Sequence, residues 1–324
     1  MACASVPDCT LSAFYDSGVP EEISELALSP EVEMWVAEHV ELAGAIRLFH
    51  ERPWATVWQV PVVDGVVWLK VCAPVQAFEP CLTATLASRW PRLLPEVLAA
   101  DRRRGWLLLG DAGERLGFGF GPDPWLSLLP TYADLQRGEA VYAAQHLGAE
   151  VPDRRLGRFP ALYDAMLAHE LPLTTTDHAR FEAFAPRFGQ LCQELESAGV
   201  PATIQHDDLH GNNVYPDGAG RILDWGDACV SHPFLTLFVP LLHLEEMEGL
   251  TRDDPWFPRL RDAYLERWGR PADLREAFEL ANRIGPFANL FKELRVLDAV
   301  AENDRHLVTG LPSVLTRCIA FTTA

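Results

Sequence analysis

One short stretch of this 324-residue chain carries most of the side chains that can do chemistry. It runs from His206 to Asn213 as HDDLHGNN, and Asp224 follows in the segment LDWGD. Asp208 is a carboxylate that can accept a proton from a hydroxyl group. Asn213 and Asp224 offer the amide and carboxylate oxygens that Mg²⁺ takes as ligands. The spacing therefore predicts a proton acceptor beside a metal ion.

The residues around these groups predict a β-hairpin. An apolar strand over 202–205 precedes the first group, and short strands are expected over 213–215 and 221–223. Pro216-Asp217-Gly218 supplies the turn between them. A hairpin of this length brings its two ends together, so the oxygens near its start and its end converge on one point.

Two other interpretations start from the same residues. Asp, His and Asn are common turn formers, so each of them alone fits an ordinary turn. His206, Asp208 and His210 also suggest the metal site of a hydrolase. Such a site needs further His or carboxylate ligands at close spacing. The sequence contains no H-E-x-x-H or similar set, which disfavours the hydrolase.

The joint motif resembles the catalytic segments of the aminoglycoside-phosphotransferase-like small-molecule kinases, which read H-G-D-L-H-x-x-N and D-W-G-D. The resemblance implies that Asp208 is the catalytic base or orients the acceptor hydroxyl. It implies that Asn213 and Asp224 hold Mg²⁺ bound with ATP. His206 would brace the loop, and His210 would contact the phosphoryl group in transfer.

Two positions depart from that family. Asp207 stands where the family usually has glycine, and it adds a carboxylate beside the base. After the second motif the family commonly runs D-P-x-x-D-L, whereas this chain has Thr236 in place of the last aspartate. That aspartate is a structural anchor, so the change concerns local bracing and not the chemistry.

Lysine is rare in this chain, because Lys70 and Lys292 are its two lysines among many arginines. Lys70 lies in VVWLKV, a strand that resembles the V-A-I-K strand of kinases, where the lysine contacts the phosphates of ATP. Glu79 begins an apolar-periodic helix that can aim a carboxylate at Lys70. The alternatives are an edge-strand lysine that extends to solvent and a favourable charge at a helix N-terminus.

The region over 45–110 predicts a small antiparallel sheet with one helix. Strands are expected over 45–50, 56–61, 66–71, 95–100 and 106–109. After Leu109 the strand character ends, and the resemblance implies that the chain crosses between lobes there. Backbone groups from Leu109 to Asp111 would meet the adenine.

The segment between the first two strands, residues 51–55, has no glycine. Protein kinases cover the ATP phosphates at this place with G-x-G-x-x-G. Some small-molecule kinases of the superfamily use a loop with serine or threonine instead. Thr56, or the backbone near Ala55, is therefore expected to contact the phosphates.

The whole chain predicts an α+β protein with the two-lobe protein-kinase-like fold. Residues 1–44 form an N-terminal arm and a helix that starts at Ser29-Pro30. Residues 45–110 form the nucleotide-binding N-lobe, and residues 111–324 form a larger, mainly helical C-lobe with the catalytic loop and the acceptor site. Helices of the C-lobe are expected over 129–147, 159–170, 177–198, 234–248, 259–268, 273–291 and 293–307.

The composition of the chain excludes several classes of partner and location. The net charge of −19 leaves no basic surface for nucleic acid. Without an uncharged apolar stretch of about eighteen residues, no membrane span is expected. The N-terminus lacks the order of a signal peptide, and seven cysteines without a C-x-x-C pair favour reduced thiols over a Cys3–Cys9 bridge. We expect a cytoplasmic monomer or homodimer.

An acidic segment over 243–254 follows the metal-binding motif and contains five carboxylates. In the family that this chain resembles, this region tends to face the acceptor. With Asp207 and Asp227 nearby, the segment predicts a cationic, amine-bearing acceptor. The alternative, a solvated helix end with no part in binding, stays open.

The sequence therefore predicts an ATP- and Mg²⁺-dependent phosphotransferase that acts on a hydroxyl group of a small molecule. A catalytically inactive nucleotide-binding protein of the same fold is the alternative. A protein kinase is disfavoured, because no A-P-E segment and no activation loop of usable length separate Asp224 from the helix expected near Phe234.

Overall fold

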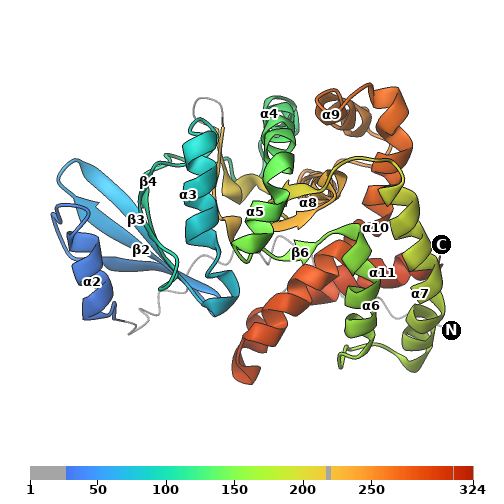
Figure 1. Ribbon diagram of the computed structural model, residues 1–324, viewed down its shortest axis with the longest axis horizontal. Coiled ribbons are helices and arrows are strands. Elements are labelled where there is room, and N and C mark those ends of the chain that lie inside the picture. Colours follow the sequence, from blue (N-terminus) through green and yellow to red (C-terminus); the bar gives the residue numbers. More distant parts are fainter. Residues whose placement is uncertain (1–26, 217–219, 309, 324) are drawn as a thin grey trace.

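The computed structural model describes residues 27–216, 220–308 and 310–323, and it has two lobes (Figure 1). The smaller lobe is a five-stranded antiparallel sheet with two helices, and the larger lobe is mainly helical. The α+β fold class predicted from the sequence is therefore confirmed. The N-terminal arm up to residue 26 and the expected turn at Asp217-Gly218 lie outside the described residues.

The sheet of the smaller lobe has the strand order β1-β2-β3-β5-β4. The first helix begins where expected, because the Ser29 side chain accepts a hydrogen bond from the Val32 amide at 3.4 Å. It ends earlier than expected, and the chain then pairs Leu42 with Val62. The elements are α2 (Pro30–Ala37), β1 (Arg47–Arg52), β2 (Ala55–Val62), β3 (Gly65–Cys72), α3 (Glu79–Arg89), β4 (Val97–Asp101) and β5 (Trp106–Gly110).

The two faces of this sheet have different neighbours. Leu69 of β3 belongs to a hydrophobic cluster with Trp35 and Val36 of α2. Because successive side chains of a strand point to opposite faces, Lys70 lies on the face that is turned away from α2. Figure 1 shows α3 between the sheet and the helical lobe.

The larger lobe has eight α-helices among its described residues, and a second, larger hydrophobic core. Residues 271–299 form one continuous helix where the sequence predicted two, over 273–291 and 293–307. A final helix was not predicted. The helices are α4 (Asp123–Glu139), α5 (Ala143–Gly148), α6 (Phe159–Leu167), α7 (Thr175–Glu196), α8 (Phe238–Met247), α9 (Trp256–Leu265), α10 (Pro271–Ala299) and α11 (Leu311–Thr323).

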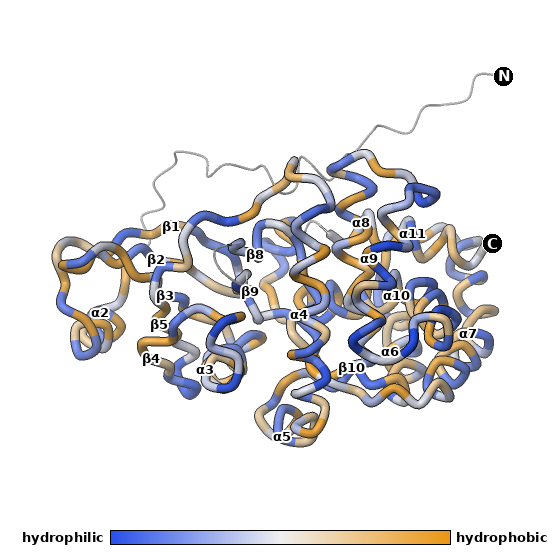
Figure 2. The backbone as a smooth tube through the Cα atoms, turned by 90° about the horizontal axis from the view of Figure 1, so that it is seen from above, coloured by the Kyte–Doolittle hydropathy of each residue, from blue (hydrophilic) through white to orange (hydrophobic). Residues whose placement is uncertain are grey.

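Two small sheets hold the segment that carries the motifs. One has the order β6-β10-β7, and the other is the hairpin of β8 and β9, as predicted. Figure 2 shows this hairpin between the five-stranded sheet and the helices. The bounds are β6 (Asp153–Arg154), β7 (Thr203–Gln205), β8 (Val214–Tyr215), β9 (Arg221–Ile222) and β10 (Cys229–Ser231).

Two expectations about thiols and membranes can be compared with the structure. All five cysteines of the described ranges are free thiols, while Cys3 and Cys9 fall in the undescribed part. Over those same ranges, no helix is both long enough and apolar enough to span a bilayer.

Candidate active site

An ion-pair cluster around the buried Lys70 connects the two lobes. Its Nζ atom lies 2.6 Å from Glu79 Oε2 at the start of α3 and 2.7 Å from Asp224 Oδ1 after β9. Glu79 Oε1 also accepts a hydrogen bond from the Trp225 amide at 3.1 Å. Burial alone would lower the pKa of Lys70, but the two carboxylates raise it well above its ordinary value. The ammonium is therefore held charged, and the ion pair expected between Lys70 and Glu79 is present.

The loop after β7 is braced by His206, as the resemblance implied. The His206 ring pairs through Nε2 with the Leu223 carbonyl at 2.8 Å, which ties the loop to β9. The His206 amide donates to the Tyr132 hydroxyl at 2.9 Å, and this hydroxyl lies 3.2 Å from Thr236 Oγ1. Thr236 thus takes part in the bracing through Tyr132, at the position where the family has an aspartate.

Asp208 lies among polar groups from its own loop and from α10. His210 Nε2 lies 3.2 Å from its Oδ2 atom, and Lys292 Nζ of α10 lies 3.1 Å from its Oδ1 atom. The Asn213 side-chain amide donates to the Asp208 carbonyl oxygen at 2.9 Å. Burial opposes ionisation, but Lys292 and then His210 lower the pKa of Asp208 well below its usual value. Asp208 is therefore an ionised hydrogen-bond acceptor.

Asn213 and Asp224 are close because the Leu223 amide donates to the Asn213 carbonyl at 3.0 Å across the hairpin. The Asn213 amide nitrogen is engaged by Asp208, so its side-chain oxygen is the atom left to bind a cation. The Asp224 side chain is 55% exposed. The ammonium of Lys70 lowers the pKa of Asp224. Two hard oxygen donors of this kind fit Mg²⁺.

The hydrolase interpretation has no support in the geometry. Within the described ranges, no group of three or more His, Cys, Asp or Glu side chains can hold a metal ion. His206, Asp208 and His210 are adjacent in sequence, but the two histidine rings serve the loop: His206 bonds Leu223, and His210 accepts from the Asn212 amide at 3.2 Å.

Lys292 is the site residue that the sequence reasoning missed. It lies in the middle of α10 with 7% of its surface exposed, and Glu293 Oε1 is 3.3 Å from its Nζ atom. The signal was present, because lysine is so rare that Lys70 had been assigned a role on that ground. The same reasoning applies to Lys292, and both lysines of the chain lie at this site.

Asp207 has a structural partner. It adopts a left-handed backbone conformation with φ of 64°, and its buried carboxylate is ion-paired with Arg154 of β6. Asp227 is paired with Arg295 of α10 at 3.1 Å. The expectation that these two carboxylates add negative charge for an acceptor is therefore wrong, because each is matched by an arginine from a distant segment.

The acidic segment over 243–254 is also engaged within the chain. Glu245 is paired with Arg252, and Glu246 with Arg317 of α11. Glu248 accepts hydrogen bonds from the amides of Gly119 and Gly121, at 2.7 and 3.2 Å. These three carboxylates hold the fold together, which removes most of the basis for predicting a cationic acceptor.

Thr56 does not lie on the same face of the sheet as Lys70, so the register gives no support to the expectation that its side chain contacts phosphates. Val57 pairs with Lys70 across β2 and β3, whereas Thr56 pairs with Val71 and faces α2. The Thr56 hydroxyl accepts a hydrogen bond from the Trp58 indole at 2.8 Å. Ala55, whose backbone was the other candidate, is buried beside the turn after β1.

The register places two side chains of β1 on the Lys70 face. His50 pairs with Val57, which pairs with Lys70, and Arg52 pairs with Ala55, which pairs with Cys72. Burial, followed by Arg52, lowers the pKa of His50, and the charges of Asp224 and Lys70 also act on it. A neutral imidazole therefore lies near the lysine, in the segment that lacks glycine. His50 could not be chosen from the sequence alone, because the face on which a side chain lies depends on the register of its strand.

The crossing between the lobes follows β5, as expected. Leu109 is buried and pairs with Trp68 on one side and Val97 on the other. Asp111 comes directly after the strand, and its carboxylate accepts a hydrogen bond from the Trp68 indole at 3.0 Å. The contact of Leu109 and Asp111 with adenine stays a prediction.

No protein-family model and no curated protein sequence matches this chain, but solved structures do. The macrolide 2′-phosphotransferase of Brachybacterium faecium has a TM-score of 0.57 at 17% identity, covering 90% of this chain and 98% of that chain. The ethanolamine kinase of Plasmodium vivax has a TM-score of 0.60 at 11% identity, covering 86% and 83%. This chain has the fold of the protein-kinase-like small-molecule kinases.

A third structure with this kinase-like fold is the streptomycin–ATP–APH(2″)-IIa ternary complex. It matches with a TM-score of 0.53 at 15% identity, over 90% of this chain and 97% of that chain. In the kinase-like fold the sheet lobe is the N-lobe and the helical lobe is the C-lobe. The ion pairs of Lys70 and the loop around Asp208 therefore lie where the two lobes of the kinase-like fold meet.

Proposed function

We propose that this protein transfers the γ-phosphoryl group of ATP to a hydroxyl group of a small molecule. One observation carries the proposal: Lys70 is ion-paired with both Glu79 and Asp224, beside a loop that holds Asp208 and Asn213 together. These are the groups that phosphoryl transfer needs to position phosphates, metal and acceptor. Residues 45–110 would bind the nucleotide, and residues 111–324 would bind the acceptor.

In the transfer, the acceptor oxygen forms a bond to the γ-phosphorus, and the bond from that phosphorus to the β–γ bridging oxygen breaks, so ADP leaves. The proton of the hydroxyl group passes to the Asp208 carboxylate or to an oxygen of the phosphoryl group that is being transferred. Asp208 orients the hydroxyl, because its ionised carboxylate can accept that hydrogen bond. Lys70 would contact the α and β phosphates, with Glu79 holding its ammonium in place.

Asn213 and Asp224 would hold Mg²⁺, as their oxygen donors suit this ion. When bound, Mg²⁺ would supply positive charge that neutralises the negative charge on the phosphate groups during transfer. The use of ATP is supported by the streptomycin–ATP–APH(2″)-IIa ternary complex, which has the same fold.

Two single variants, Asp208→Asn and Asp224→Ala, test the proposed function. Loss of a positioned base is typically worth roughly 10²- to 10⁴-fold in turnover. We expect Asp208→Asn to lose that much kcat in an ADP-release assay while its affinity for ATP with Mg²⁺, measured by calorimetry, stays close to wild type. Asp224→Ala should lose the Mg²⁺-dependent part of ATP binding.

The main alternative is a nucleotide-binding protein without catalysis. It predicts that the wild type binds ATP with Mg²⁺ but releases no ADP with any alcohol. An Asp208→Asn variant that keeps more than about a tenth of the wild-type turnover would also contradict the role of Asp208.

A further inference from the structure

Lys292, the second lysine of the chain, lies against the proposed base Asp208, and its inferred role rests on the proposed function. We propose that Lys292 is a positioning residue for the γ-phosphoryl group of ATP. Its ammonium neutralises the Asp208 carboxylate and so allows the anionic phosphoryl group to approach the acceptor hydroxyl that Asp208 holds. Lys70 pairs with the carboxylate at the far end of the hairpin, Asp224, from the N-lobe side.

The ammonium of Lys292 is a buried positive charge in contact with Asp208. Its Nζ atom lies 3.1 Å from Asp208 Oδ1 and 3.3 Å from Glu293 Oε1. In the part of the chain that the structure describes, no other lysine and no arginine lies within 4.0 Å of the Asp208 carboxylate. Lys292 therefore supplies the positive charge that Asp208 meets at hydrogen-bond distance.

His210 holds the second oxygen of Asp208 without adding a charge. The Nδ1 atom of His210 accepts a hydrogen bond from the Asn212 amide at 3.2 Å, so this nitrogen carries no proton. The other ring nitrogen, Nε2, lies 3.2 Å from Asp208 Oδ2 and can donate to it. The histidine thus fixes the orientation of the carboxylate, while Lys292 balances its charge.

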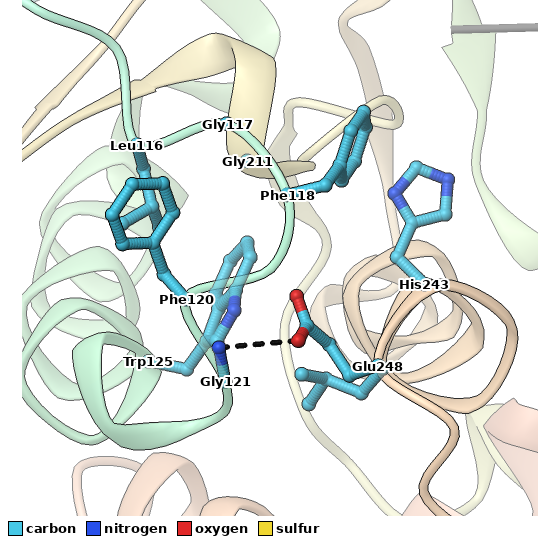
Figure 3. Close-up of a pocket in the computed structure, with 10 residues that line it drawn as sticks. Leu116, Gly117, Phe118, Phe120, Gly121, Trp125, Gly211, His243 and Glu248 are labelled. Atoms are coloured by element: carbon cyan, nitrogen blue, oxygen red, sulfur yellow. Dashed lines mark hydrogen bonds between the residues drawn. The ribbon is translucent and has the colours of Figure 1, made fainter. Parts of the chain in front are cut away.

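The catalytic loop is also fixed by the segment before α4. The Gly117 amide donates to the Gly211 carbonyl at 2.9 Å, and a Cβ atom at Gly211 would collide with the Gly117 carbonyl oxygen. Figure 3 shows Phe118, the next residue of this segment, beside His243 of α8. The His210 ring lies against both, with ring centroids 6.0 and 5.2 Å away. The loop therefore has little freedom to move the base away from the lysine.

Helix α10 is fixed one turn beyond Lys292. Arg295 Nη2 lies 3.1 Å from Asp227 Oδ1, shortly after Asp224, and Arg295 Nη1 donates to the Val75 carbonyl of the N-lobe at 2.6 Å. Residues three apart lie on one face of a helix, so Lys292 and Arg295 extend from the same face of α10. Contacts with both lobes therefore set the place of the Lys292 ammonium.

The charge on Asp208 matters because an anion must approach it. A hydroxyl bonded to a carboxylate lies about 3 Å from it, and the phosphorus that it attacks lies about 3–3.5 Å farther away. The γ-phosphoryl group thus comes within roughly 6 Å of the Asp208 carboxylate. Two negative charges repel strongly at that distance in a partly buried site. An ammonium bonded to the carboxylate cancels most of this repulsion, and the more distant α and β phosphates are affected less.

The affinity for ATP relative to ADP tests this role, because ADP lacks the γ-phosphoryl group. Calorimetry with Mg²⁺ and either ADP or the non-hydrolysable analogue AMP-PNP gives two Kd values for each variant. We expect Lys292→Met to weaken AMP-PNP binding roughly tenfold or more, since repulsion between unit charges at this distance is worth at least this much. ADP binding should stay close to wild type. Lys292→Arg, which keeps the charge, should keep the wild-type ratio of the two Kd values.

A double variant distinguishes action through Asp208 from a direct contact between Lys292 and the phosphoryl group. In Lys292→Met with Asp208→Asn both charges are removed, so the repulsion is removed as well. We expect the ratio of the two Kd values to return close to that of wild type, while turnover stays low because the base is missing. A ratio as poor as that of Lys292→Met alone would overturn the inference.

Arg283→Met is the matched control for the loss of a positive charge from α10. Arg283 is exposed on the same helix, and its guanidinium lies over the Phe321 ring, 5.6 Å from the centroid. This substitution should leave the ratio of the Kd values unchanged. If thermal unfolding shows that Lys292→Met is too unstable for calorimetry, Lys292→Gln takes its place, because its amide can still donate to Asp208 but carries no charge.

The binding measurements do not depend on turnover, so the two proposals can fail separately. A purely structural Lys292 would weaken the binding of ADP and AMP-PNP equally. Such an unchanged ratio, in a protein whose wild type releases ADP with an alcohol, overturns the inference and leaves the proposed function standing. A wild type that binds AMP-PNP but phosphorylates no alcohol contradicts the proposed function, and the positioning role in transfer fails with it.

Discussion

Asp207 illustrates how a single residue can be misread when its partner is far away in sequence. Beside the base it suggested extra negative charge for a substrate. Its partner, Arg154, is 53 residues earlier and comes from a two-residue strand. Ordinary sequence patterns do not link such positions, whereas the residues within the HDDLHGNN stretch could be assigned because their spacing is local.

The buried Asp207–Arg154 ion pair predicts that removing either charge destabilises the protein, but by unequal amounts. Asp207→Asn leaves the buried guanidinium of Arg154 without a counter-ion, and arginine does not lose its proton. We expect a loss of about 3–5 kcal/mol in the free energy of unfolding, the range for breaking a buried pair. Arg154→Met should cost less, because burial already raises the pKa of Asp207 and the carboxyl can take up a proton.

The double variant Asp207→Asn with Arg154→Met completes the cycle. Its loss should be smaller than the sum of the two single losses, since no buried charge remains in it. Urea unfolding of the four proteins at pH 7 gives the three values. Additive losses would mean that the two side chains do not act as a pair.

At the scale of elements, the strands of the N-lobe were predictable because they are short runs rich in apolar residues, and the turns at Asp64-Gly65 and over 101–105 contain aspartate and glycine. The register of the strands could not be predicted, and it decides which side chains lie on the same face of the sheet as Lys70. The region of helix α10 was predicted as two helices, over 273–291 and 293–307, which left Lys292 between them. In the structure the helix continues and buries Lys292 against Asp208.

The register of β1, β2 and β3 makes a prediction for two neighbouring positions. Thr56→Val should leave KM for ATP within about twofold of wild type, because Thr56 faces α2. It should cost roughly 1 kcal/mol of stability, since the Trp58 indole loses its acceptor. His50→Ala should raise KM for ATP by roughly tenfold, as a hydrogen bond to a charged group is worth about 1.5–3 kcal/mol.

Steady-state kinetics over a range of ATP concentrations, with thermal unfolding of each variant, provides the measurement. A larger effect on KM from Thr56→Val than from His50→Ala would contradict the observed register. Comparable effects on KM would mean that neither side chain reaches the nucleotide.

At the scale of the whole molecule, the order of the motifs was enough to predict a two-lobe fold, even though the compared structures are only 11–17% identical to this chain. The acceptor could not be predicted in the same way. Its charge preference depends on which carboxylates are paired, and pairs such as Glu246 with Arg317 and Asp227 with Arg295 join segments that meet only after folding.

The larger core also carries a pH dependence that concerns the stability of the whole protein. His232 is 2% exposed, and its ring accepts a hydrogen bond from the Phe234 amide at 3.3 Å. Burial lowers its pKa from 6.5 to about 3. Between these values the unfolded chain binds a proton at this residue and the folded protein does not. Stability is therefore fully present above pH 6.5 and falls as the pH decreases toward 3.

His232→Asn isolates this contribution, because asparagine keeps a side-chain acceptor for the Phe234 amide but does not titrate. We expect the wild type to lose up to about 1.4 kcal/mol per pH unit more than the variant between pH 6 and pH 4. Urea unfolding at pH 7, 6, 5 and 4 measures the difference. The variant can be less stable than the wild type at pH 7, yet its curve should converge with the wild-type curve as the pH falls. Parallel curves would show that His232 takes up its proton in the folded protein as easily as in the unfolded chain.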